Sequence, residues 1–97
     1  MRERCASEAV IFVDEALEES AVSRWGQLLE EAVTLHPGRL VVDLRDAPRI
    51  DESAIVMLLQ VHHAVTMGNG RLLLRAPGPQ VRGMLAFGRL DSFFEIV

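Results

Sequence analysis

The sequence contains no lysine, because all ten of its basic residues are arginine. A P-loop, a Schiff-base enzyme and a lysine-dependent phosphoacceptor domain all need a lysine amine, so the sequence supports none of them. Cysteine is nearly absent too. The single residue, Cys5, cannot form an internal disulfide, which is typical of a protein in a reducing, cytoplasmic compartment.

Long hydrophobic runs are also missing. No apolar run approaches 18 residues, and the charged N-terminus has no long apolar region behind it, so we expect neither membrane insertion nor a signal peptide. The net charge of −4 argues against general nucleic-acid binding. With 97 residues, of which 49% are hydrophobic and 25% charged, the chain is predicted to fold as one domain over residues 1–97.

Apolar runs alternate with segments of helical periodicity along the chain. Short apolar runs at 9–13, 40–44, 71–75 and 94–97 predict strands, and helices are expected at about 20–35, at 52–67 and in a short stretch around 81–85. The expected inward face of the first helix consists of Val22, Trp25, Leu28, Leu29, Ala32 and Leu35. Strands that alternate with helices imply right-handed crossovers. We therefore expect an α/β domain with a mostly parallel sheet of about four strands and three to four helices.

The stretch 40–59 is central to the functional interpretation. Residues 40–44 are typical of a strand buried on both faces, and a turn at 47–48 separates this strand from the second helix. Asp51 is a favourable N-cap residue, whose carboxylate can accept a hydrogen bond from the amide of Ser53 or Ala54. Asn69 or Gly68 suits the left-handed position that ends this helix. Because free amides at a helix start favour negative charge, we expect this start to belong to the functional site.

Other polar groups give no sign of a cofactor or a metal. The acidic segment 14–19 has carboxylates that are merely adjacent, which is more typical of a solvated helix start than of a metal site. His62 and His63 point away from each other on a helix, so they cannot share a metal. The glycines at 68 and 70 follow a helix and precede a strand, the reverse of the order in a phosphate-binding loop. We expect no cofactor.

Several segments of the chain form an ordered set, namely 40–44, 50–55, 68–74, Pro77, 81–85 and 90–96. Taken together, these segments resemble a STAS domain, a fold named for sulphate transporters and anti-sigma factor antagonists. The similarity covers about Arg39 to Val97 well and the N-terminal third loosely. It implies a small non-enzymatic module that acts by partner switching. In the anti-sigma factor antagonist branch of the family, the domain binds an anti-sigma factor, usually a serine kinase, and phosphorylation of the domain breaks the complex.

The family's phosphoacceptor is a Ser or Thr directly after the Asp that starts the second helix. Here that residue is Glu52, and Ser53 matches the second serine of the family motif. Arg89 also falls where glycine is usual, before Leu90. Glu52 has two interpretations: an ordinary acid in the first helical turn, worth about 0.3–1 kcal/mol, or a permanent negative charge at the switch position. Ser53 is either a local amide cap or a displaced phosphoacceptor.

The second helix carries more apolar residues than its expected inward face needs. Val56, Met57 and Val61 lie on its flanks, where either a neighbouring helix covers them or they form a contact patch beside the helix start. The predicted partner-binding residues are Glu52, Ser53, Val56, Met57, Gln60 and Val61. We expect a monomer or a weak dimer.

Three hypotheses follow from the sequence. The first is a regulatory module, similar to anti-sigma factor antagonists, that binds an anti-sigma factor or serine kinase-like protein. The second is a STAS subunit of a bacterial ABC lipid-transport complex, docked on the ATPase. The third and weakest is an enzyme or phosphoacceptor that uses Asp43, Asp46 and Asp51 near strand ends. Genomic neighbours would separate the first two hypotheses.

Overall fold

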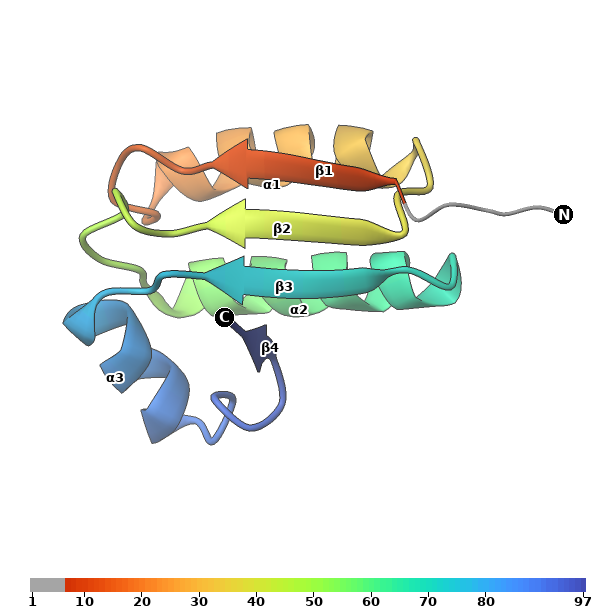
Figure 1. The fold of residues 1–97 in the computed structure, drawn as a ribbon. Coiled ribbons are helices and arrows are strands. Elements are labelled where there is room, and N and C mark those ends of the chain that lie inside the picture. Colours follow the sequence, from red (N-terminus) through yellow and green to blue (C-terminus); the bar gives the residue numbers. More distant parts are fainter. Residues whose placement is uncertain (1–6) are drawn as a thin grey trace, which may run out of the picture.

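The computed structural model describes residues 7–97, in which four parallel strands alternate with three helices (Figure 1). The elements are β1 (Glu8–Phe12), α1 (Ser20–Val33), β2 (Arg39–Asp43), α2 (Glu52–Met67), β3 (Arg71–Arg75), α3 (Pro79–Phe87) and β4 (Glu95–Ile96). The predicted α/β class, the parallel sheet and the range of helix number are confirmed. In the described part of the chain no helix is both long and apolar enough to span a membrane. Cys5 lies outside the described residues.

Strand order in the sheet follows sequence order, β1-β2-β3-β4, and each neighbouring pair is parallel. Because parallel crossovers are right-handed, such an order places successive helices on the same face, and Figure 1 shows α1 and α2 together behind the sheet. The sheet side chains on this face are packed in the core with residues of all three helices. This core includes Leu40, Val42, Leu72 and Leu74 from the central strands and Leu29, Leu58 and Leu85 from the helices.

The opposite face of the sheet has no helix over it in Figure 1. Side chains alternate along a strand, so Val41 and Leu73 point to this face, yet each is only 2% exposed. Their neighbours along the strands are arginines and acids that form ion pairs. These pairs are Arg39 with Glu8, Arg71 with Glu95 and Arg75 with Asp43. The aliphatic stems of the arginines shield the apolar side chains. The predicted burial of β2 on both faces is therefore confirmed, and on one face ionic side chains flank the buried residues.

Asp43 at the end of β2 is the one charged side chain in the buried class among residues 7–97. Its carboxylate accepts hydrogen bonds from the Arg75 Nε at 2.8 Å and from the Arg45 backbone N–H at 2.9 Å. Burial by itself would raise the pKa of Asp43, but the Arg45 amide and the Arg75 guanidinium together outweigh it and lower that pKa. Asp43 is therefore an ionised structural group that ties β2 to β3.

All three helices are followed by a non-glycine residue in the left-handed conformation. These residues are His36, Asn69 and Arg89, with φ values of 51°, 67° and 59°. The predicted left-handed position near the end of α2 is thus taken by Asn69. After α3, the backbone N–H of Leu90 donates to the carbonyl of Leu85 at 2.7 Å, which is the six-to-one bond of a Schellman motif. Glycine suits the Arg89 position better than arginine does, because left-handed φ crowds a Cβ.

Candidate functional site

The start of α2 is organised by the Asp51 carboxylate. One oxygen, Oδ1, accepts hydrogen bonds from the Ala54 backbone N–H at 2.9 Å and from the Ser53 hydroxyl at 2.6 Å. The other oxygen, Oδ2, accepts from the backbone N–H of Glu19 at 3.0 Å. The predicted N-cap role of Asp51 is confirmed. The contact with Glu19 was not foreseen, and it fixes the residue before α1 against the start of α2.

These hydrogen bonds also set the charge of Asp51. The Ser53 hydroxyl contributes most to lowering the pKa of Asp51, and the amides of Glu19 and Ala54 lower it further against the opposing effect of burial. The carboxylate therefore stays ionised at neutral pH, with both oxygens engaged. Its geometry serves to hold the two helix starts in place.

The loop between β1 and α1 braces the same region. The backbone N–H of Leu17 donates to the Arg49 carbonyl at 2.8 Å, and the Asp51 N–H donates to the Leu17 carbonyl at 3.3 Å. Two of the four acids of this segment form ion pairs with arginines. Glu18 pairs with Arg49 at 3.0 Å, and Glu15 accepts from Arg24 at 3.0 Å as well as from the indole N–H of Trp25 at 2.7 Å. Glu15 and Glu18 are thus bonded to side chains of this region, and the first turn of α1 contains no acid, although the sequence favoured a solvated helix start.

Glu52 and Ser53 are both exposed, but they border different hollows of the surface. Ser53 lines a groove between α1 and α2, whereas Glu52 lines a second groove between α2 and α3. Consecutive residues on a helix project about 100° apart, which explains the divergence. The side chain of Val56, one turn further along α2, borders both grooves.

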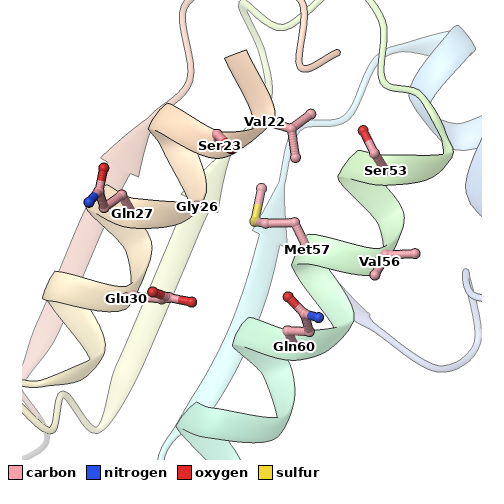
Figure 2. A pocket seen from close by; sticks show the side chains of 9 residues that line it. All are labelled: Val22, Ser23, Gly26, Gln27, Glu30, Ser53, Val56, Met57 and Gln60. Atoms are coloured by element: carbon pink, nitrogen blue, oxygen red, sulfur yellow. The ribbon is translucent and has the colours of Figure 1, made fainter. Parts of the chain in front are cut away.

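The groove between α1 and α2 has a volume of about 460 Å³ (Figure 2). Its lining consists of Val22, Ser23, Gly26, Gln27 and Glu30 from α1 and Ser53, Val56, Met57 and Gln60 from α2. Figure 2 shows the Met57 side chain directed toward α1. A Cβ added at Gly26 would lie 3.0 Å from the Met57 Cγ, so the absence of a side chain at Gly26 makes room for Met57 between the helices.

The structure brings four of the predicted partner-binding residues together in this groove, but it corrects the expected exposure of two of the six. Val61 is 2% exposed and belongs to the core, and Met57 is 8% exposed. The reason is that α1 packs against this flank of α2. Val56 is 53% exposed and Gln60 is also exposed, so both remain accessible. Sequence reasoning missed the contribution of α1, although a glycine within a predicted helix, Gly26, is a signal of close helix packing.

Comparison with known proteins bears on the family and the fold of this chain. The family model described as "STAS domain" matches residues 3–97. The chain belongs to the STAS domain family. A STAS-domain containing protein of Pseudomonas aeruginosa strain UCBPP-PA14 is 38% identical over 66 residues, which are 68% of this chain and 65% of that protein. The alignment thus spans slightly less than two thirds of the relative.

Solved structures show the same fold at low sequence identity. A Thermotoga maritima protein described as a candidate anti-sigma factor antagonist superimposes with a TM-score of 0.81 at 16% identity, over 90% of this chain and 77% of that one. The anti-sigma factor antagonist SpoIIAA in its unphosphorylated form superimposes with a TM-score of 0.72 at 18% identity, over 99% and 84% of the two chains. The resemblance expected from the sequence is therefore confirmed for the family and the fold.

Proposed function

We propose that this STAS protein is a non-enzymatic regulatory module that binds an anti-sigma factor of the serine-kinase type and acts by partner switching. The binding surface is the start of α2 together with the groove between α1 and α2. The family match and the likeness to anti-sigma factor antagonists support this choice. The accessible residues of the predicted set are Glu52, Ser53, Val56 and Gln60.

The position of Glu52 carries the proposal. This residue directly follows the Asp51 cap and is exposed, and among residues 7–97 its carboxylate takes part in no ion pair. A glutamate supplies one negative charge, whereas a phosphoserine supplies about −1.5 to −2 and three acceptor oxygens. Glu52 is thus a permanent but incomplete substitute for a phosphorylated residue. We propose that the partner contacts it directly.

Two of the three carboxylates of the enzyme hypothesis form structural hydrogen bonds, and the third, Asp46, is exposed. Asp43 is buried and bonded to Arg75, and Asp51 has both oxygens engaged by Glu19, Ser53 and Ala54. Neither presents a free oxygen pair to a substrate, which supports a binding role over catalysis.

Affinity capture from native lysate of the source organism, with identification by mass spectrometry, tests the proposal. The bait is the full chain, compared with Val56→Asp at the proposed surface and with Leu35→Asp as control. Val56 and Leu35 are both exposed apolar residues, 53% and 78% accessible, but Leu35 lies in the turn beyond the far end of α1. A serine kinase-like anti-sigma factor retained by wild type and by Leu35→Asp, but lost with Val56→Asp, supports the proposal. Recovery of a permease and its ATPase instead would favour the ABC-transport alternative.

A further inference from the structure

The second groove beside α2 differs in character from the first. It lies between α2 and α3, has a volume of about 500 Å³, and is lined by Glu52, Ile55, Val56, Met84, Phe87, Gly88 and Leu90. Phe87 is 94% exposed, the highest value among the large exposed hydrophobic residues of the described chain, and Val56 is 53% exposed. An exposed phenylalanine beside an apolar hollow indicates a contact surface rather than a folding requirement.

Glu52 is the one charged residue in the lining of this groove, and the residue before it, Asp51, is also acidic. A helix start carries the equivalent of about half a positive charge, which is less than the two carboxylates of Asp51 and Glu52 beside it. The Asp51 carboxylate is bonded to groups of this chain, whereas no ion pair within residues 7–97 uses Glu52. An occupant that complements this groove is apolar along its length and positively charged at its tip.

We propose, on the basis of the proposed function, that the groove between α2 and α3 receives an arginine side chain of the partner protein. The three methylenes of arginine would lie along Ile55 and Met84, and its guanidinium would pair with Glu52. The open ring of Phe87 gives the planar guanidinium a stacking surface, which a lysine ammonium would use less well. The inference assigns a role to Phe87 and Met84, which lie outside the predicted site.

Nuclear magnetic resonance with isotope-labelled full chain tests this without the partner. The probe is the peptide acetyl-Ala-Leu-Arg-Leu-Ala-amide, and its control is the same peptide with citrulline, the neutral analogue of arginine. We expect the arginine peptide to shift the signals of Ile55, Met84, Phe87 and Leu90, and to bind about tenfold more tightly than the citrulline peptide. Equal binding of the two peptides, or shifts confined to the α1–α2 groove, would overturn the inference.

Variants of the chain separate the contribution of the Glu52 charge to peptide binding from that of the apolar Phe87 ring. Glu52→Gln should lower the binding affinity for the arginine peptide by about tenfold, so that the arginine and citrulline peptides bind equally. Phe87→Ser should weaken both peptides without loss of stability, because the Phe87 side chain is 94% exposed. Asp91→Asn changes the net charge by the same amount as Glu52→Gln but lies outside the lining, so it should leave binding unchanged.

The same variants distinguish this inference from the proposed function. A kinase-type partner that binds wild type and Phe87→Ser equally well would overturn the groove assignment and leave the proposed function standing. A chain that binds the arginine peptide in the groove but captures only a permease and ATPase would contradict the proposed function and support the groove assignment.

Discussion

The backbone N–H of Glu19 donates a hydrogen bond to Oδ2 of Asp51, 32 positions later in the chain, at 3.0 Å. Glu19 is the residue before α1 and has a left-handed φ of 53°. The other oxygen of Asp51 caps α2 through Ala54. One carboxylate therefore contacts the starts of both helices that form the α1–α2 groove.

Asp51→Ala should destabilise the protein by about 1–2 kcal/mol, because an N-cap is lost and two amides lose their acceptor. Urea unfolding followed by circular dichroism measures this difference. Asp46→Ala serves as the control, since Asp46 is exposed and should change the free energy of unfolding by less than about 0.5 kcal/mol. Equal stabilities of the two variants would show that the Asp51 hydrogen bonds contribute little.

Stability should fall in acid. The folded protein lowers the pKa of both Asp43 and Asp51, so these groups contribute stability above the unfolded pKa, which is about 3.9. That contribution is lost as pH falls through the lower folded pKa values. Urea unfolding between pH 7 and pH 2 should show this decline. The decline should be shallower in Asp43→Asn and Asp51→Asn than in wild type, and a profile as steep in both variants would assign the acid sensitivity elsewhere.

The same substitution at two adjacent residues of α2 should change the free energy of unfolding by very different amounts. Met57→Asp would place a carboxylate in a site that is 8% exposed, against α1, and should cost more than about 2 kcal/mol. Val56→Asp, at 53% exposure, should stay within about 0.5 kcal/mol of wild type. Differential scanning calorimetry measures both. A small loss for Met57→Asp would mean that Met57 behaves as a surface residue, as the contact-patch interpretation of the sequence assumed.

The secondary structure could be predicted because each element has a clear local period and a clear stop signal. The burial of helix flanks could not. Leu35 is 78% exposed although the pattern placed it on the inward face of the first helix, and for the buried Val61 the pattern left both burial and exposure open. Periodicity shows that a helix has an apolar side, but which flank a neighbouring helix covers depends on the strand order. Leu35 lies beyond the end of α1, past the part of the helix that packs on the sheet.

The candidate site was predictable only where its contacts are local. The Asp51 bond to Ala54 spans three residues and follows from capping chemistry. The bond to Glu19 and the pair between Asp43 and Arg75 span 32 residues each. Such pairs require the register of parallel strands and the placement of loops, which residue patterns do not specify.

Arg89→Gly should stabilise the protein by about 1 kcal/mol. The reason is the left-handed φ of 59° at Arg89, which costs a residue with a Cβ about 1–2 kcal/mol. Glycine removes this strain, but it also makes the unfolded chain more flexible, which offsets part of the gain in stability. Arg89→Ala is the control, since it removes the side chain but keeps the crowded Cβ, and it should give no gain. Melting temperatures of the three proteins decide the matter, and equal stabilisation by both variants would place the effect in the arginine side chain.

Glu52→Ser restores the residue type on which the partner switch of the family depends, and it separates two consequences of the glutamate. If the partner has adapted to a carboxylate, the variant loses a charged hydrogen bond, and affinity should fall by about 1.5–3 kcal/mol. If the glutamate instead holds the protein in a weak-binding state, affinity should rise and the variant should become a kinase substrate. We expect the fall, because the α2 start already tolerates the charge and a permanently weak binder would have little use.

Isothermal titration with the captured partner measures the affinity of each variant, and Glu52→Gln shows how much of the change in affinity is due to charge. Mass spectrometry after incubation with the partner and ATP completes the test: phosphorylation of wild type at Ser53 that breaks the complex would contradict both alternatives, because the switch would then have moved by one residue along α2.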